Sequence, residues 1–193
     1  DFLEDANNQY REWSNKMSLA SWQQSSNITD ENTEYLKEVT AQYSKWRKEL
    51  GEKAKLFDFE KMVFIREKRQ FEKFAVYGTS ALSEEDGKKF NDVGIRMKTI
   101  YSEATVFVND TQMELEPDLV ELMATSTNSE ILKEAWTKWR DETGKKMRSD
   151  YIEYFKLGNK AAKANGIPGK NFETFDDLWM FEWESPDLKE QVD

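Results

Sequence analysis

Residues 131–157 read ILKEAWTKWRDETGKKMRSDYIEYFKL, and this stretch indicates the fold class most clearly. Leu132, Trp136 and Trp139 recur at spacings of three and four residues, which places them on one face of an α-helix. Arg140 follows Trp136 by four residues and is expected on the same aromatic face. A buried guanidinium needs an anion or a hydrogen-bond partner. Two interpretations stay open: Arg140 extends to solvent along the tryptophans, or it forms part of an anion-binding site.

Outward from this stretch, most of the chain shows the same helical periodicity. Helices are expected over residues 2–25, 30–56, 59–76, from 83 onward, 116–124, 129–143, 145–164 and 174–183. Between Thr105 and Leu115 the period changes around Asn109-Asp110, which predicts a short irregular hairpin or a loop. The prediction is an all-α chain of seven or eight helices. Residues 1–193 are expected to form a single region, because no linker, repeat or low-complexity tract divides them.

Several residues mark the ends of these expected helices. Thr29 offers an N-cap oxygen, and Ser83–Asp86 forms a capping-box pattern. Asp58 is the expected N-cap of the helix over 59–76. Gly144 is expected to interrupt the opening stretch, and Gly158 to let another element approach the helix that follows.

The charge balance excludes some classes of partner. The chain has 193 residues with 28 Lys and Arg against 38 Asp and Glu, a formal net charge of −10. Nucleic acids and anionic membrane surfaces both require clustered positive charge, so neither is expected as a partner. No apolar run approaches the roughly 20 residues that a membrane-spanning helix needs.

Cysteine and histidine are both absent. Disulfides, thiolate chemistry and Ser-His or Cys-His nucleophiles are therefore excluded. A zinc site would have to consist of carboxylates alone, which is atypical of zinc in proteins. Acidic pairs such as Asp176-Asp177 are better explained as charges at helix starts. From the residues alone we predict no catalytic residue, no metal site and no cofactor in this chain.

Two N-glycosylation sequons are present, Asn27-Ile-Thr29 and Asn109-Asp-Thr111. The chain begins at Asp1 without a methionine, which suggests a processed or trimmed terminus. Together these features favour a secreted or extracellular protein. An exported protein without a disulfide is unexpected.

Six groups of short motifs follow one another at near-constant separation, and together they resemble the N-terminal part of the angiotensin-converting enzyme family, peptidase family M2. The motifs are Ser18–Trp22 with Asn27–Asn32, Ile100–Ser102 with Ala104–Val106, Leu115–Leu119, Met123–Ser126, Ala135–Gly144 and Asn159–Gly166, and the resemblance extends over essentially the whole chain.

This resemblance implies a secreted zinc peptidyl-dipeptidase, or an ectodomain with that activity, whose helical domain is split by a cleft and gated by N-terminal lid helices. The family's cofactors are zinc and chloride. The chain would then be a truncated piece, about the first third of that domain, because the HExxH zinc helix and its downstream glutamate ligand lie further along. Its partners would be the remainder of the domain or other protein chains, with self-association through exposed core residues.

The resemblance assigns roles to three residues. Arg140 matches an arginine that helps to hold chloride. Glu116 matches an acidic residue that lines the substrate cleft in some members, although a carboxylate at a helix start explains it almost as well. Asn27 matches a commonly glycosylated asparagine. The family's cysteine pair is missing from the segment over 106–115, and such a disulfide typically contributes about 2–4 kcal/mol.

Two functions therefore stay open. The chain is the lid-bearing part of a zinc dipeptidyl carboxypeptidase, or it is a stand-alone, non-catalytic M2-like binding or structural protein. The missing cysteines favour the second function, whereas the retained Arg140 and tryptophans favour the first.

Overall fold

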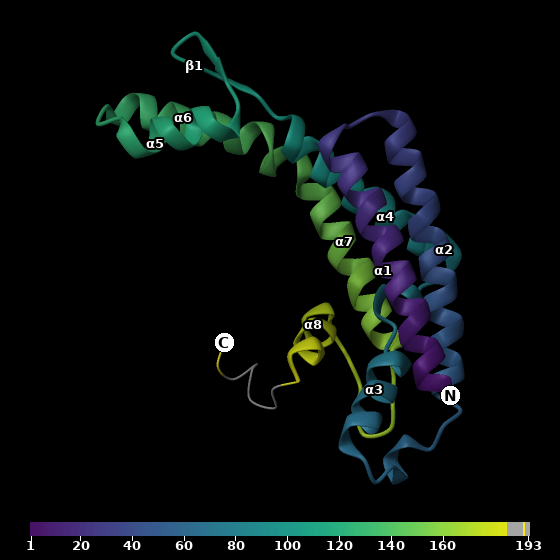
Figure 1. The fold of residues 1–193 in the computed structure, drawn as a ribbon. Coiled ribbons are helices and arrows are strands. Elements are labelled where there is room, and N and C mark those ends of the chain that lie inside the picture. Colours follow the sequence, from purple (N-terminus) through teal and green to yellow (C-terminus); the bar gives the residue numbers. More distant parts are fainter. Residues whose placement is uncertain (185–190, 192–193) are drawn as a thin grey trace. The chain divides into compact units, whose positions relative to one another are not determined.

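The structure is a computed structural model that describes residues 1–184 and 191 (Figure 1). Helices dominate it, as the all-α prediction requires. Its elements are α1 (Phe2–Ser26), α2 (Asp30–Ala54), η1 (Phe59–Lys61), α3 (Ile65–Ala75), η2 (Gly78–Ala81), α4 (Glu84–Glu103), β1 (Val106–Val108), β2 (Thr111–Met113), η3 (Leu115–Leu119), α5 (Val120–Thr125), α6 (Ser129–Glu142), α7 (Gly144–Ala164) and α8 (Phe175–Trp183).

The chain divides into two compact units. Unit 1 contains residues 1–92 and the described residues from 155 onward, and unit 2 contains residues 93–154. Helices α4 and α7 each contribute residues to both units. That the whole chain forms a single region stays a prediction. Within the described residues, none of the helices is long and apolar enough to cross a bilayer.

Unit 1 begins with a helical hairpin of α1 and α2 (Figure 1). Their facing sides meet through aromatic rings, including Trp13 and Trp46, whose centroids lie 5.9 Å apart. At the turn, the Thr29 hydroxyl accepts a hydrogen bond from the backbone N–H of Asn32 at 3.2 Å, so the predicted N-cap is confirmed. The Asn32 side chain also donates to the carbonyl of Asn27 at 2.7 Å and closes the connection.

The expected helix over 59–76 is wrong in its first part. Residues 59–61 form the short helix η1, and α3 begins only at Ile65. Asp58 makes no capping hydrogen bond; its carboxylate pairs with Lys61 at 2.6 Å instead. Met62 and Phe64 then adopt extended backbone angles, so the chain changes direction before α3. The core of unit 1 forms where Phe59 and Phe71 pack with the end of α2 and with residues 162–178.

A buried polar side chain connects the end of α3 to α2. The Arg47 guanidinium on α2 donates to the carbonyls of Lys73, Phe74 and Val76 at 2.6, 2.8 and 2.9 Å. These carbonyls end α3 and have no partner further along the helix. Burial lowers the pKa of Arg47, and the carbonyl dipoles compensate for the loss of water around its charge.

Unit 2 contains the only strands among the described residues, which confirms the hairpin rather than the loop. Strands β1 and β2 pair antiparallel, with Val106 opposite Met113 and Val108 opposite Thr111. Asn109 and Asp110 both have positive φ, 49° and 61°, as a two-residue type I′ turn requires.

A small core holds the hairpin against α6. Val106 and Val108 pack with Leu119 and Ala135, and the Lys138 amino group donates to the carbonyl of Phe107 at 2.7 Å. Side-chain packing and one charged hydrogen bond therefore stabilise the β1–β2 hairpin, which has no disulfide.

Two further helix boundaries can be compared with the sequence predictions. Thr143 ends α6 and α7 begins at Gly144, so the predicted interruption is confirmed. The helix expected from Glu116 is wrong at its start, because Glu116 has extended angles (φ −124°, ψ 129°) inside η3 and the α-helical part, α5, begins at Val120. The Asp118 carboxylate accepts a hydrogen bond from the backbone N–H of Glu114 at 3.0 Å, which orders this turn.

Candidate functional site

The candidate anion residue, Arg140, lies on the exposed side of α6 in unit 2. Helix α6 presents two parallel stripes at four-residue spacing. Residues 131, 135 and 139 pack against the hairpin core, whereas residues 132, 136 and 140 form the neighbouring stripe. Trp139 and Trp136 therefore belong to different stripes, which corrects the single aromatic face expected from the sequence. Trp136 is 54% exposed.

The guanidinium of Arg140 is stacked on the indole of Trp136. Its central carbon lies 2.9 Å from the ring centroid, and Nη1 donates to the carbonyl of Trp136 at 3.3 Å. An arginine over a tryptophan face gains a cation–π attraction of about 0.5–1 kcal/mol when exposed. This stacking agrees with the interpretation in which Arg140 extends to solvent along a tryptophan, and the described residues leave Arg140 exposed. The assignment of Arg140 to chloride stays a prediction.

The acids next to Arg140 in the sequence have other partners. Asp141 pairs with Lys145 at 3.4 Å, and Glu142 pairs with Lys146. Within the described part of the chain, the structure gives the Arg140 guanidinium no ion pair, and Trp136 holds it in place. Its remaining N–H donors therefore face solvent.

Glu116 is exposed, in the first turn of η3. Asp118, and not Glu116, accepts the hydrogen bond that orders this turn. Glu116 and Arg140 both belong to unit 2, but among the described residues no hydrogen bond or ion pair joins them. The structure thus leaves the Glu116 carboxylate accessible without assigning it a ligand.

Both sequons lie at exposed turns. Asn27 follows the last residue of α1, and Asn109 occupies the tip of the β-hairpin. Their backbone groups take part in the turns: the carbonyl of Asn27 accepts from Asn32, and the N–H of Asn109 donates to Glu134 at 3.4 Å. Both side chains are accessible, as glycosylation requires, while occupancy stays a prediction.

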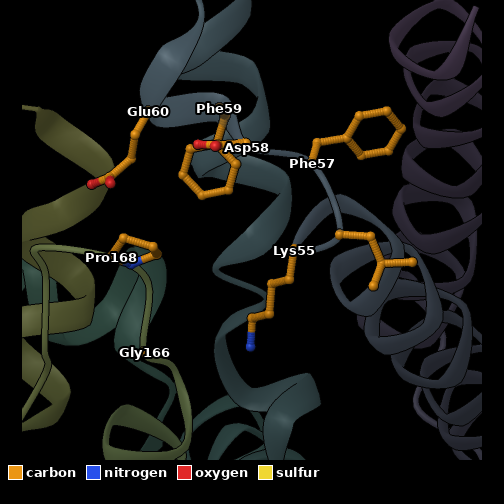
Figure 2. A pocket seen from close by; sticks show the side chains of 8 residues that line it. Lys55, Phe57, Asp58, Phe59, Glu60, Gly166 and Pro168 are labelled. Carbon is orange, nitrogen blue, oxygen red and sulfur yellow. The ribbon is translucent and has the colours of Figure 1, made fainter.

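A hollow of about 360 Å³ in unit 1 was not predicted from the sequence. Figure 2 shows the Lys55 side chain between η1 and the segment of Gly166 and Pro168. The Lys55 amino group lies 3.2 Å from the hydroxyl of Tyr77. The sequence offered no motif for this hollow, because its lining comes from segments more than 100 residues apart.

The groups beside this hollow are not arranged for catalysis. Burial, and the hydrogen bond that its hydroxyl donates to the Glu52 carboxylate, raise the pKa of Tyr77. Tyr77 therefore stays protonated at neutral pH and cannot act as a base. The hollow is lined by charges of both signs, from Lys55, Asp58 and Glu60, so it does not define one class of ligand.

The residues present do not fit a zinc ion. The sequence has no histidine or cysteine, and no cluster of three acidic side chains is placed to hold a metal among the described residues. No step of a metal-dependent reaction is therefore assigned to side chains of this chain.

Comparison with known proteins first places the chain among the peptidases: the family model Peptidase_M2 matches residues 1–193. The chain belongs to this family, whose model is described as angiotensin-converting enzyme. It is 33% identical to the angiotensin-converting enzyme of Bos taurus over 180 residues, and 32% identical to that of Sus scrofa over 193 residues. The enzyme of Mus musculus is 32% identical over 180 residues.

The matched regions make up nearly all of this chain but only a small part of each relative. They cover 93%, 100% and 93% of this chain, but only 13%, 14% and 13% of the cattle, pig and mouse enzymes. The chain thus spans about one-seventh of the length of these relatives. The family resemblance drawn from the ordered motifs is confirmed.

Proposed function

We propose that this chain forms the N-terminal lid and cleft portion of a zinc peptidyl-dipeptidase domain. One observation supports this above all: the chain matches a peptidase family from its first to its last residue, yet it contains no histidine. A family member without histidine needs its zinc ligands from elsewhere. In this proposal the chain shapes the cleft, and residues outside it supply the zinc site and the reaction.

The hairpin of α1 and α2 is the proposed lid. On α1, Leu19 is 59% exposed and Trp22 is 70% exposed, although both residues are large and apolar. Solvent is a poor environment for such side chains, so a surface of this kind favours contact with a peptide or with another part of a domain. The exposed sequon at Asn27, at the end of α1, supports a secreted or extracellular location.

Arg140 is the proposed arginine of a chloride site, and Glu116 the proposed acidic residue of the substrate cleft. A guanidinium that is stacked on an indole and has no ion pair among the described residues is what one half of an anion site would present, since the aromatic ring fixes its orientation. The second half would come from residues outside this chain. Within this proposal, Arg140 has a positioning role and takes no part in bond cleavage.

The experiment with the sharpest outcome is the sequence of the encoding transcript. We expect the reading frame to continue into an HExxH motif downstream of codon 193. A stop codon directly after Asp193 would overturn this proposal. The purified 193-residue chain should release no dipeptide from a blocked tripeptide in a chelator-sensitive manner, and such release would contradict the absence of a zinc site.

The second candidate is a stand-alone M2-like binding or structural protein. The hairpin over 106–113 favours it, because a type I′ turn and a small core hold this segment without the family's disulfide. Selection on a zinc enzyme would not explain why the cysteines were lost. A stop codon after residue 193, together with a stable monomer in sedimentation analysis, would favour this candidate.

A further inference from the structure

The chain contains one Asn-Gly pair, Asn165-Gly166, directly after the end of α7. Asparagine followed by glycine is the dipeptide most prone to lose its side-chain amide, because glycine has no Cβ to hinder attack by its own backbone nitrogen. Every other asparagine of the chain is followed by a residue that carries a side chain. In an unfolded chain, this pair is therefore the position where such a reaction is fastest.

In the folded chain, the Asn165 amide is fully buried and fully hydrogen-bonded. Its oxygen accepts from the backbone N–H groups of Tyr77 and Gly78 at 2.9 and 3.0 Å, and its nitrogen donates to the carbonyls of Gly78 and Ala161 at 2.8 and 2.7 Å. These four bonds use both hydrogens and both lone pairs of the amide. Attack at Cγ turns this planar group tetrahedral and expels its nitrogen, so the hydrogen bonds must open before it can react.

Gly166, in contrast, is exposed and lies with Pro168 at the edge of the hollow shown in Figure 2. A Cβ at Gly166 would meet a single atom within 4 Å, the Oδ1 of Asn171 at 3.8 Å, whereas a Cβ at Gly158 would lie 2.5 Å from the ring of Phe175. Gly166 also does not have a positive φ. Packing therefore does not require glycine at this position, and an alanine there changes the reactivity of the pair without disturbing the fold.

We propose that Asn165-Gly166 is a deamidation site that the fold protects, and that it reacts when the segment of Tyr77 and Gly78 separates from the end of α7. The backbone nitrogen of Gly166 loses its proton and bonds to Cγ of Asn165, the Cγ–Nδ2 bond breaks, and the side-chain nitrogen leaves as ammonia with that proton. Water then opens the cyclic imide at either carbonyl, which gives aspartate or isoaspartate. Nothing is oxidised or reduced, and water is the only co-reactant. This inference does not depend on the proposed function, since it concerns one joint within unit 1.

Neither product restores the joint. An aspartate at position 165 keeps an oxygen for the N–H groups of Tyr77 and Gly78, but its second oxygen faces the carbonyls of Gly78 and Ala161, to which the amide nitrogen now donates. An ionised carboxylate only accepts hydrogen bonds, and burying its charge against two carbonyls is strongly unfavourable. Isoaspartate adds a methylene group to the main chain at the same point. The reaction is therefore a one-way change: a chain that opens long enough to react loses the contact that closes it.

The test compares the folded and the unfolded chain at mildly alkaline pH, which favours loss of the proton from the attacking nitrogen. The chain is incubated in buffer or in denaturing urea, and the tryptic peptide of residues 164–170, released by cleavage after Lys163 and Lys170, is followed by mass spectrometry and by an isoaspartyl methyltransferase assay. In urea we expect the rate of the synthetic peptide of the same residues. In buffer we expect a rate at least about a hundredfold lower, because local opening must precede the reaction. Asn159, which is followed by Lys160, is the internal reference and should stay unconverted.

Two variants separate the chemistry from the fold. G166A should convert in urea at least about tenfold more slowly than the unchanged chain, because its Cβ hinders the attacking nitrogen, and its urea unfolding curve should be unchanged. N165D supplies one product directly and should lose hydrogen-exchange protection at the amides of Tyr77 and Gly78.

Four outcomes would overturn the proposal. Equal rates in buffer and in urea would show that the fold does not protect the pair, and no conversion in urea would show that it is not a deamidation site. Conversion of G166A at the unchanged rate would contradict attack by the nitrogen of Gly166. Full protection of the amides of Tyr77 and Gly78 in N165D would contradict the one-way change.

Discussion

Replacing Asn165 by alanine should destabilise unit 1 strongly, although the change removes no charge and little apolar surface. The Asn165 side chain is fully buried at the end of α7. Its oxygen accepts from the backbone N–H groups of Tyr77 and Gly78 at 2.9 and 3.0 Å. Its amide nitrogen donates to the carbonyls of Gly78 and Ala161 at 2.8 and 2.7 Å. All its hydrogen-bonding capacity is used to hold the segment after α3 against α7.

The magnitude follows from these contacts. A typical hydrogen bond contributes about 1 kcal/mol net, and a buried group left without a partner costs about 1–3 kcal/mol. Alanine removes four bonds and leaves the buried N–H of Tyr77 without an acceptor, so we expect a loss of about 3–4 kcal/mol. A domain is typically stable by only about 5–15 kcal/mol, so this loss is a large part of the total.

The assay is urea unfolding followed by circular dichroism, together with hydrogen exchange at the amides of Tyr77 and Gly78. Asn159→Ala is the matched control, because Asn159 lies on the same helix and accepts one bond, from the N–H of Phe175 at 2.8 Å. We expect it to cost about 1 kcal/mol. If N165A cost no more than N159A, or if both amides kept their protection, the reasoning would be refuted.

Three further changes test other contacts. Arg47→Met removes the guanidinium from the carbonyls of Lys73, Phe74 and Val76 and should cost about 3 kcal/mol in urea unfolding, with R47K intermediate; a loss below about 1 kcal/mol would contradict the capping role. The hydrogen bonds from Arg96, at 2.7 and 2.5 Å, lower the pKa of Asp150, so D150N should cost about 1 kcal/mol at pH 7. This stabilisation is present above the ordinary aspartate pKa of about 3.9 and is lost as the pH falls below it. The stabilities of D150N and the unchanged chain should therefore become equal in acid, and a difference that persists at pH 2 would contradict this expectation. In a eukaryotic secretory host, N27Q and N109Q should each increase gel mobility to the same extent as one enzymatic deglycosylation, whereas unchanged mobility would show that the sequon is unoccupied.

Local signals predicted most element boundaries, because their physics involves neighbours in sequence. The Ser83 hydroxyl does accept from the N–H of Asp86 at 3.2 Å, and α4 begins at Glu84. The Asp177 carboxylate accepts from the N–H of Thr174 at 3.0 Å at the start of α8, as expected of a helix-start acid. The prediction that Asp58 is an N-cap was wrong, because its carboxylate pairs with Lys61. The neighbouring sequence does not distinguish such an ion pair from a capping hydrogen bond.

Long-range contacts lay beyond sequence reasoning, because their partners are backbone groups or rings far along the chain. Gly51 lies inside α2, where a glycine ordinarily weakens a helix. The structure shows that a Cβ at this position would lie 2.1 Å from the ring of Tyr77, so glycine is required for packing. Gly158 was expected to permit a close approach, and a Cβ there would lie 2.5 Å from the ring of Phe175. The sequence shows where a glycine lies, but only the tertiary structure shows which ring packs against it.

The position of Arg140 gives the two candidate functions different physical consequences. Two unit charges 4 Å apart attract by about 1 kcal/mol in water but by about 4 kcal/mol at the lower dielectric near a covered surface. Because Arg140 is exposed, chloride held by this chain alone would gain only the smaller amount, which is too little to compete with hydration. A covering surface would raise the gain and would also bury Trp136. The stripe of residues 132, 136 and 140 can therefore hold an anion only if another surface covers it. In a stand-alone protein, Arg140 would only form the cation–π stack with Trp136.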